Sequence, residues 1–327
     1  MTAPESKPTV LLTRRWPSPV EEALAQRYDV TTNPNDAPMS AAALADAMRR
    51  YDAVCPTVTD TISAEVIGGG DARAKIIGNF GVGFEHIDLD AAKAASVVVT
   101  NTPGVLTDAT ADIALMLMLA TARRAGEGER LVRANAWGGW APTQLMGVHM
   151  TGKTLGLVGF GRIAQATAKR AHHGFGMPVI YHGPSRKNAD IEAACGAAFR
   201  DSLEALLEDA DFISLHCPGG AATRHLIGAK EFARMKPTAI LVNTARGTVI
   251  DADALAQALK AGRIAGAGLD VYDGEPKVPD ALKALENVVL APHLGSATHE
   301  TRIAMGMRVV DNLDRFFAGE PPRDRVA

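Results

Sequence analysis

The stretch Lys153–Ala164 reads KTLGLVGFGRIA, and it decides the fold of this chain. It opens with the apolar run Leu155–Val158, which has the length of a buried strand, and a helical pattern follows it through Arg170. Between strand and helix stand the small residues of a G-x-G-x-x-[GA] spacing: Gly159, Gly161 and Ala164. This strand–turn–helix context predicts a dinucleotide site, because the helix N-terminus offers unpaired N–H groups and the positive end of its dipole to a pyrophosphate.

Each position in this turn has a separate physical role. Gly159 permits the tight turn, Gly161 leaves room for a pyrophosphate, and Ala164 lets the helix pack closely on the strand. Arg162 stands in the first helical turn, where its guanidinium can add a charge-assisted contact to a phosphate. The alternative is an ordinary Gly-rich turn without a ligand. We expect the cofactor contacts of the turn from these residues: Gly159, Phe160, Gly161, Arg162 and Ile163.

Length and composition indicate a globular protein of two domains. The chain of 327 residues is long for one core, and its 47% hydrophobic and 22% charged residues are globular values. The net charge of −3 gives no electrostatic reason to expect a nucleic acid or a membrane surface as a partner. The N-terminus lacks the features of a secretory signal, and the apolar run Ile113–Ala122 is too short to span a bilayer. We therefore expect a cytoplasmic protein.

The cysteines point in the same direction. Cys55, Cys195 and Cys217 are far apart and odd in number, and none belongs to a C-x-x-C pair or a Cys/His metal spacing. Reduced thiols in a cytoplasmic protein are the expected state, and we expect no metal site.

The first hundred residues alternate short apolar runs with helical patterns. Ser40 is placed to cap one of these helices, Ser40–Arg50. The alternation predicts a parallel, doubly wound sheet. No G-x-G-x-x-G spacing follows the first strand, so this half is not the obvious nucleotide site. The expected strands are Val10–Leu12, Tyr28–Thr31, Ala53–Cys55, Ala74–Gly78 and Val97–Thr100.

The segment between the two alternating regions has a different character. The residues of Asn101–Gly104 are typical of a turn, and we expect the chain to pass from one domain to the other there. A long helical pattern, Asp108–Arg133, is apolar nearly all round in its middle and predicts a buried helix or a subunit contact. The irregular stretch Ala136–Met150 holds Trp137 and Trp140, whose rings we expect to cover a pocket or a dimer contact.

From residue 154 the alternation restarts and predicts a second sheet. A final helix, Thr298–Phe317, follows another crossing near Pro292 and is expected to return to the first domain. The expected fold is thus α/β with two doubly wound parallel-sheet domains. A Rossmann nucleotide domain, residues 104–291, is inserted into a flavodoxin-like substrate domain, residues 1–103 and 292–327. Six strands are expected in the nucleotide domain: 155–158, 178–182, 211–215, 238–243, 265–269 and 288–290.

Four residues that can do chemistry follow the strands of this second sheet. Arg246 comes after the strand that ends at residue 243, Asp270 and Glu275 after the next strand, and His293 after the last. Ligands of open α/β sheets bind beyond the carboxyl ends of the strands, so these side chains can converge despite their separation in the sequence.

Seven motifs run in order from about residue 75 to about residue 300 and resemble those of the D-isomer-specific 2-hydroxyacid dehydrogenases. The segment GGWAPTQLMGVHMTGKTLG, residues 138–156, most resembles the glyoxylate/hydroxypyruvate reductase branch. The first 70 or so residues match only as a pattern. The motifs are NFGVG at 79–83, NTPGVL at 101–106, LGLVGFGRIA at 155–164, LHCP at 215–218, VNTARGTVID at 242–251, AGLDVYDGEP at 267–276 and APHLGSAT at 291–298.

The resemblance implies hydride transfer from a nicotinamide cofactor to a short 2-keto acid, glyoxylate or hydroxypyruvate. Such a reaction needs a cation for the carboxylate and a proton donor for the carbonyl oxygen. Arg246 offers a bidentate fork that also polarises the carbonyl, and His293 is the natural acid near neutral pH. Glu275 would hold the His293 ring and keep it protonated for reduction. Taken singly, each of the three has a structural alternative: a surface salt bridge, a turn residue or a structural histidine.

Further roles come from the resemblance alone. The backbone N–H groups of Val82 and Gly83 would bind the substrate carboxylate, although an ordinary tight turn is the alternative. Asp270 would contact the nicotinamide amide, or else cap a turn. The resemblance also implies a homodimer built on the helix and arm near residues 105–150. Trp140 would cover the substrate of its own or of the second subunit, or else have a core or dimer role. Other expected cofactor contacts are Thr110, Cys217, Pro218, Thr244, Ala245 and Gly295.

The segment after the second strand of the nucleotide domain bears on the choice of cofactor. NAD enzymes place an acid there for the ribose 2′-OH, whereas here no carboxylate occurs before Asp190. Ser185 and Arg186 supply a hydroxyl and a fork for a 2′-phosphate, and Lys187 adds charge. We expect a preference for NADPH, with NADH also accepted. The alternative is a solvated loop and no preference.

Three rival functions remain open at this point. A dehydrogenase for a bulkier keto acid or for 3-phosphoglycerate would use the same machinery, the latter with NAD. A formate dehydrogenase would be expected to have Gln in place of Glu275. The same fold also serves as a non-catalytic NAD(H)-sensing binding module in transcriptional corepressors.

Overall fold

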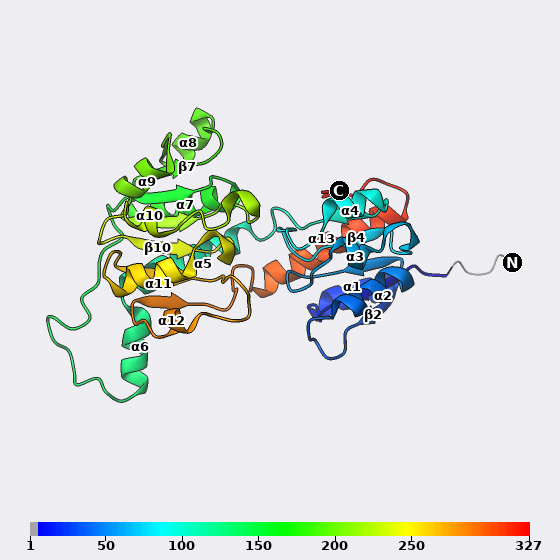
Figure 1. Ribbon diagram of the computed structural model, residues 1–327, viewed down its shortest axis with the longest axis horizontal. Helices are drawn as coiled ribbons and strands as arrows, with labels where there is room; N and C mark the ends of the chain where they lie inside the picture. Colours follow the sequence, from blue (N-terminus) through cyan, green and yellow to red (C-terminus); the bar gives the residue numbers. More distant parts are fainter. Residues whose placement is uncertain (1–5) are drawn as a thin grey trace. The chain divides into compact units, whose positions relative to one another are not determined.

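The computed structural model describes residues 6–327 and divides the chain into two compact units. We call Thr107–Ser296 the inserted unit (Figure 1). The chain before Thr107, together with Ala297–Ala327, forms the discontinuous unit. The α/β class with one sheet domain inserted into another is confirmed.

The discontinuous unit contains a sheet of five strands, all parallel, in the order β2-β1-β3-β4-β5. This is the flavodoxin-like order, as expected. The strands are β1 (Thr9–Leu12), β2 (Asp29–Thr32), β3 (Ala53–Cys55), β4 (Ile76–Gly78) and β5 (Val98–Thr100).

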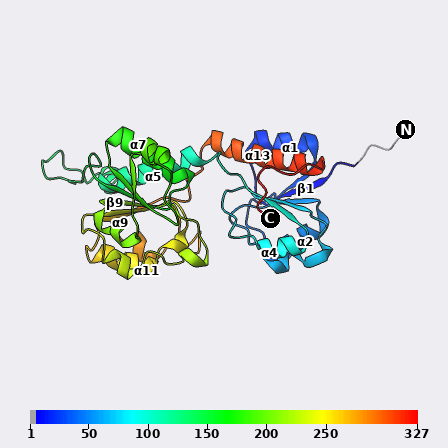
Figure 2. The same ribbon diagram turned by 90° about the horizontal axis from the view of Figure 1, so that it is seen from above.

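Helices cover both faces of this sheet: α1 and α13 lie on one face, α2 and α4 on the other (Figure 2). The expected N-cap of α2 is present, since the Ser40 hydroxyl accepts from the Ala43 N–H. The helices are α1 (Ser18–Arg27), α2 (Ala41–Arg50), α3 (Ala64–Ile67), α4 (Leu89–Ala94) and α13 (His299–Phe317).

The inserted unit contains seven parallel strands in the order β12-β11-β10-β9-β6-β7-β8. This is the Rossmann order with one strand added at the β12 end. The expectation of six strands was wrong because it missed the edge strand β8 (Ala197–Phe199), which is short, only partly buried and paired on one side alone. The others are β6 (Leu155–Val158), β7 (Val179–His182), β9 (Phe212–Leu215), β10 (Ile240–Asn243), β11 (Gly266–Leu269) and β12 (Val288–Leu290).

Two apolar cores hold this sheet between its helices. Helices α5 and α7 lie on one face, and α9 and α11 on the other (Figure 2). The strands are apolar on both faces, as expected for a buried parallel sheet. The helices are α5 (Thr107–Ala122), α6 (Ala125–Arg133), α7 (Arg162–Phe175), α8 (Ala189–Cys195), α9 (Leu203–Asp209), α10 (Ala229–Phe232), α11 (Ala252–Lys260) and α12 (Asp280–Lys283).

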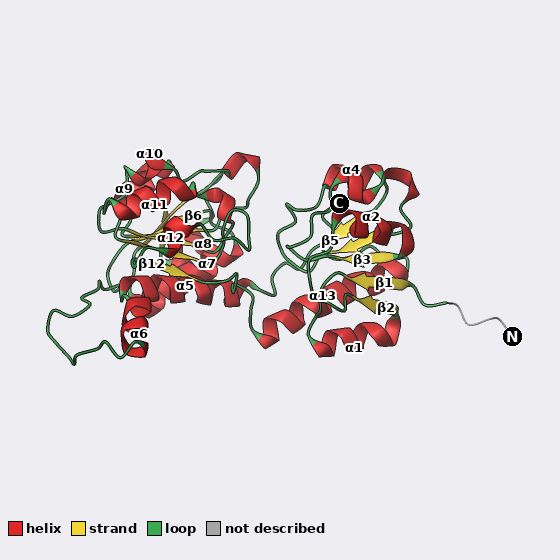
Figure 3. Ribbon diagram, turned by 60° about the horizontal axis from the view of Figure 1, so that its bottom comes forward, coloured by secondary structure: helices red, strands yellow, loops and turns green. Residues whose placement is uncertain are grey.

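The single helix expected over residues 108–133 is in fact two helices. Arg124 adopts a left-handed backbone (φ 53°) and donates its N–H to the carbonyl of Thr121, which ends α5 and starts α6. The break carries neither proline nor glycine, so the pattern does not reveal it. Much of helix α5 is buried, but Met116 and Leu119 expose more than a third of their surface. The segment after α6 is loop up to β6, as expected (Figure 3).

In the part of the chain that the structure describes, no helix combines the length and apolar character that crossing a membrane requires.

Candidate active site

The Gly-rich turn after β6 has the geometry that a pyrophosphate site needs. Gly159 has a φ of 86°, and a Cβ there would lie 2.8 Å from the backbone nitrogen of Cys217, so the protein itself requires glycine. A Cβ on Gly161, in contrast, would meet no protein atom within 4 Å. Helix α7 begins at the next residue, where its first N–H groups have no partner inside the helix. The open space beside Gly161 thus fits a bound dinucleotide.

The end of β7 lies beside this turn. The Gly159 N–H donates to the carbonyl of His182 (2.8 Å), and a Cβ on Gly183 would lie 3.9 Å from the Gly159 Cα. The loop that follows Gly183 therefore starts next to the phosphate-binding turn. Ser185 and Arg186 are both exposed in that loop.

Arg186 is anchored by a carboxylate that the sequence analysis did not identify. Its Nε and Nη2 donate to the two oxygens of Glu192 (3.0 and 2.9 Å). The Tyr181 hydroxyl also donates to Glu192 (2.8 Å) and accepts from the Lys187 N–H (2.7 Å). These hydrogen bonds, first from Arg186 and then from Tyr181, hold the pKa of Glu192 below its usual value. In the sequence, Glu192 stands three residues before Cys195, so the two lie on the same face of a helix. Because Cys195 is buried, this spacing could have indicated that Glu192 points toward the protein and not into solvent.

The remaining expected cofactor contacts lie on helix α5 and on loops of the inserted unit. Thr110 donates its hydroxyl to the carbonyl of Gly295 (3.0 Å), which joins α5 to the loop after β12. Thr244 is 9% exposed, and its buried hydroxyl has no hydrogen-bond partner among the described residues. Burial raises the pKa of the Cys217 thiol to about 11, so it is a neutral packing group. Pro218 is exposed and Ala245 half-buried.

Arg246 is carried by a tight turn at the end of β10. The buried Asn243 side chain fixes this turn, because its amide donates to the Arg246 carbonyl (2.8 Å) and its oxygen accepts from the Ala245 N–H (3.0 Å). The next residue, Gly247, lies so close to the following strand end that a Cβ would be 1.8 Å from the carbonyl carbon of Tyr272. The turn of Arg246 therefore packs directly against the segment after β11.

Glu275 and His293 form a hydrogen-bonded pair at the same edge. The Nδ1 of His293 lies 2.8 Å from Oε2 of Glu275, and the side chains are 34% and 33% exposed. Oε1 of Glu275 accepts from the Tyr272 N–H (2.9 Å). Burial alone would raise the pKa of Glu275, but the hydrogen bonds from His293 and Tyr272 and the positive charge of Arg246 together lower it. The carboxylate is thus ionised and oriented, and Nε2 of His293 is left for a substrate.

Asp270 holds the backbone that presents His293. Its two carboxylate oxygens accept from the N–H groups of Leu294 (2.6 Å) and Gly295 (2.8 Å), and its carbonyl accepts from the His293 N–H (2.9 Å). His293 itself has a left-handed φ of 56°, which the surrounding bonds must stabilise. Burial raises the pKa of Asp270 against the effect of the two backbone donors. These are the contacts of a turn cap, one of the two roles expected for Asp270.

Val82 and Gly83 lie in the Gly-rich turn after β4 of the discontinuous unit. The side-chain amides of two buried asparagines hold this turn: Asn101 donates to the Val82 carbonyl and Asn79 to the Gly83 carbonyl, both at 2.8 Å. The carbonyls are therefore occupied, whereas in the described chain the N–H groups of Val82 and Gly83 have no protein acceptor.

Phe80, at the start of the same segment, lines an open cavity of about 550 Å³. Arg15 and the first turn of α13, which includes His299 and Glu300, complete its wall. No role was expected for Arg15, His299 or Glu300, because Arg15 is far from the other two in the sequence.

The two loop tryptophans are exposed. Trp140 exposes 82% of its surface and Trp137 53%, with the Trp137 indole N–H donating to Gln144 (3.1 Å). Neither ring covers a core of its own unit. Other exposed apolar side chains of α5, α6 and this loop are Met116, Leu119, Val132, Met146 and Val148.

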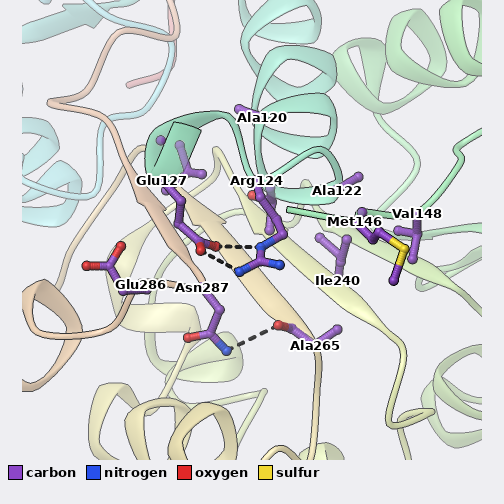
Figure 4. Close-up of a pocket in the computed structure, with 14 residues that line it drawn as sticks. Ala120, Ala122, Arg124, Glu127, Met146, Val148, Ile240, Ala265, Glu286 and Asn287 are labelled. Atoms are coloured by element: carbon purple, nitrogen blue, oxygen red, sulfur yellow. Dashed lines mark hydrogen bonds and ion pairs between the residues drawn. The ribbon is translucent and has the colours of Figure 1, made fainter. Parts of the chain in front are cut away.

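A second cavity, of about 390 Å³, lies at the amino ends of β10, β11 and β12 (Figure 4). Arg124 and Glu127 form an ion pair in its wall through two hydrogen bonds (2.9 and 2.6 Å), and Asn287 donates to the carbonyl of Ala265 (3.1 Å). The carboxyl ends of the same strands carry Arg246 and His293, so this cavity is not part of the candidate active site. The described residues contain no cluster of His, Cys, Asp or Glu able to hold a metal ion.

Comparisons with known proteins identify the family. The model for "D-isomer specific 2-hydroxyacid dehydrogenase, NAD binding domain" matches residues 115–295. A glyoxylate reductase of Thermococcus litoralis is 46% identical over 98% of this chain and 97% of its own. A glycerate dehydrogenase of Hyphomicrobium methylovorum is 40% identical over 96% of this chain and 97% of its own. The solved NADPH-dependent glyoxylate/hydroxypyruvate reductase of Sinorhizobium meliloti, in complex with NADP and malonate, has a TM-score of 0.87 and 34% identity over 98% of this chain and 97% of its own.

These matches define an oxidoreductase with a nicotinamide-binding domain. Within that class, the chain belongs to the family of D-isomer-specific 2-hydroxyacid dehydrogenases, as its motifs indicated. The space beside Gly161 and the buried hydroxyl of Thr244 fit the cofactor of such an enzyme.

Proposed function

We propose that this enzyme reduces glyoxylate or hydroxypyruvate to the corresponding 2-hydroxy acid, with NADPH as its preferred cofactor. The observation that carries the proposal is the 2.8 Å contact between His293 and an ionised Glu275 at the carboxyl edge that also carries Arg246. The names of the glyoxylate reductase and glycerate dehydrogenase relatives support a short 2-keto acid as the substrate.

The proposed chemistry uses three side chains. The bound reduced cofactor supplies the hydride to C2. Arg246 binds the substrate carboxylate through its fork and polarises the carbonyl. Nε2 of His293 gives its proton to the carbonyl oxygen, so the C=O bond becomes CH–OH and the imidazole becomes neutral. Glu275 orients the ring through its contact with Nδ1.

The backbone N–H groups of Val82 and Gly83 are proposed to bind the substrate carboxylate. Support comes from these N–H groups, which have no protein acceptor in the described chain, and from the two asparagine amides that hold the turn through its carbonyls. Trp140 is proposed to limit the size of the substrate from a second subunit, because its ring is exposed within its own chain.

The inserted unit is proposed to bind the dinucleotide and the discontinuous unit the substrate. Ser185 and Arg186 are proposed to bind the 2′-phosphate of NADPH, since their loop starts beside the phosphate-binding turn. Asp270 is proposed to contact the nicotinamide amide, and Thr110, Cys217, Pro218, Thr244, Ala245 and Gly295 to line the cofactor site.

The enzyme is proposed to form a homodimer through α5, α6 and the following loop. Seven large apolar side chains are exposed in this region, including Trp137 and Trp140, and a second copy would bury them. Sedimentation velocity tests this proposal: a dimer is expected, and a monomer at micromolar concentration would contradict it.

Initial rates test the proposed reaction. Glyoxylate, hydroxypyruvate, pyruvate and phenylpyruvate are each assayed with NADPH and with NADH. Fast turnover of the two proposed acids with NADPH is expected. A preference for phenylpyruvate would refute the substrate, a preference for NADH would refute the cofactor assignment, and cofactor binding without turnover of any keto acid would indicate a sensing module.

A further inference from the structure

We propose that Tyr272 is a positioning residue whose hydroxyl ties the carboxyl ends of β11 and β12 together and so keeps His293 on Glu275. The proposal rests on the proposed acid–base role of His293. No role was assigned to Tyr272 from the sequence, although it lies inside the motif that carries Asp270 and Glu275.

The hydroxyl of Tyr272 lies within hydrogen-bond distance of two backbone carbonyls. Its oxygen is 2.9 Å from the carbonyl oxygen of Ala291 and 3.1 Å from that of Leu269. Leu269 is the last residue of β11, and Ala291 directly follows β12. The same carbonyl of Leu269 accepts from the Ala291 N–H (2.8 Å). One hydroxyl therefore reinforces the joint at which the two strands end.

The backbone of Tyr272 contacts the other half of the catalytic pair. Its N–H donates to Oε1 of Glu275 (2.9 Å), while Oε2 of Glu275 is 2.8 Å from Nδ1 of His293. The side chain of Tyr272 thus fixes the strand end two residues before His293, and its main chain fixes the carboxylate that the ring must meet.

A third contact links Tyr272 to the turn of Arg246. Gly247 packs against the Tyr272 peptide so closely that any side chain there would clash. The residue consequently lies at the junction of the three loops that carry Arg246, Glu275 and His293. A displacement of Tyr272 would therefore also displace the loops that carry these three side chains.

The environment of the hydroxyl suits a permanent donor. The ring is half-buried against the apolar core of the inserted unit. Burial, followed by the negative charge of Asp270, raises the pKa of Tyr272 to about 12, so its proton is retained across the range in which enzymes are assayed. Replacement by phenylalanine keeps the ring and removes only the donor.

The test compares Tyr272→Phe with Tyr28→Phe. The control removes the hydroxyl of a buried tyrosine, which donates to Asp314 in the discontinuous unit and has no link to the pair. With glyoxylate and NADPH, kcat of Tyr272→Phe is expected to fall roughly tenfold, because small displacements of reacting groups are costly. The KM for NADPH is expected to change less than about twofold, and Tyr28→Phe to keep wild-type kinetics.

The kinetic constants separate positioning from a loss of stability. The charged groups around His293 are Glu275, Asp270 and Arg246. A displaced His293 ring lowers kcat at a nearly unchanged KM for NADPH. A merely destabilised enzyme would recover wild-type kcat when the assay temperature is kept well below its Tm.

A double-mutant cycle completes the test. In a Glu275→Gln background the Tyr272→Phe change is expected to cost less than about twofold, because the pair it protects is already broken. Full additivity, or recovery of wild-type kcat by Tyr272→Phe at low temperature, would overturn the proposal. If His293→Asn itself retained activity, the proposed function would fail instead, and the two failures are distinguishable.

Discussion

Replacement of Arg186 by alanine separates the two nicotinamide cofactors. The guanidinium has five N–H groups, and Glu192 takes two of them, so three remain for a 2′-phosphate. Hydrogen bonds to a charged group are among the stronger ones, whereas the 68% exposure of this side chain weakens them through solvent screening. Removal of the guanidinium should therefore lower kcat/KM for NADPH roughly tenfold. Use of NADH should stay within about twofold of wild type.

The assay is kcat/KM for both cofactors at saturating glyoxylate. Arg234→Ala is the matched control, since it removes another exposed arginine that pairs with a glutamate, here Glu208. The double variant Arg186→Ala/Glu192→Gln shows whether the uncovered carboxylate adds repulsion to the loss. Equal losses with NADPH and NADH would mean that Arg186 is structural, and no loss with either would refute the 2′-phosphate assignment.

Three further predictions follow from the same geometry. Gly159→Ala should lower Tm and abolish NADPH binding, because its Cβ would lie 2.8 Å from the Cys217 nitrogen. Gly161→Ala should keep the wild-type Tm, because its Cβ meets no protein atom, but weaken NADPH binding at least roughly tenfold. Thermal melts and cofactor titrations check both variants. Glu275→Gln should lower kcat for keto acid reduction at least roughly tenfold, because the 2.8 Å contact that orients the His293 ring loses its charge, while the KM for NADPH should stay within about twofold; steady-state kinetics check both. The hydrogen bond from Arg73, followed by those from Thr9, outweighs the effect of burial and lowers the pKa of Asp52. The ionised Asp52 therefore stabilises the fold above the ordinary carboxyl pKa, and this stabilisation is lost as the pH falls through the lowered pKa. The difference in Tm between wild type and Asp52→Asn should shrink when thermal melts are repeated from pH 7 down to pH 3.

Much of the fold could be predicted because parallel strands are continuous apolar runs. The run Leu155–Val158 is fully buried on both faces, and its Gly-rich sequel identifies the unit around it. The edge strand Ala197–Phe199 escaped because it is short and partly exposed, so it carries no such run. The break between α5 and α6 was not predicted because the residue with the left-handed backbone there is Arg124, and not a glycine that the sequence would reveal.

The residues of the candidate site divide along a similar line. Arg246, Glu275 and His293 follow strands of one sheet, so the sequence placed them at one edge, and the Glu275–His293 contact is present in the structure. Glu192 was missed because the carboxylate of NAD enzymes is expected at the end of the second strand. Glu192 instead reaches Arg186 from the following helix, α8. The role proposed for Tyr272 depends on the position of a hydroxyl relative to two carbonyls, and a sequence motif does not specify such a position.

His293 is proposed to protonate the keto acid while the cofactor binds elsewhere in the inserted unit. Glyoxylate reduction with NADPH by wild type and His293→Asn tests this role, with NADPH affinity measured on the same preparations. We expect NADPH binding to stay within about twofold of wild type and kcat to fall at least roughly 100-fold. Wild-type turnover by His293→Asn would contradict the proposed role.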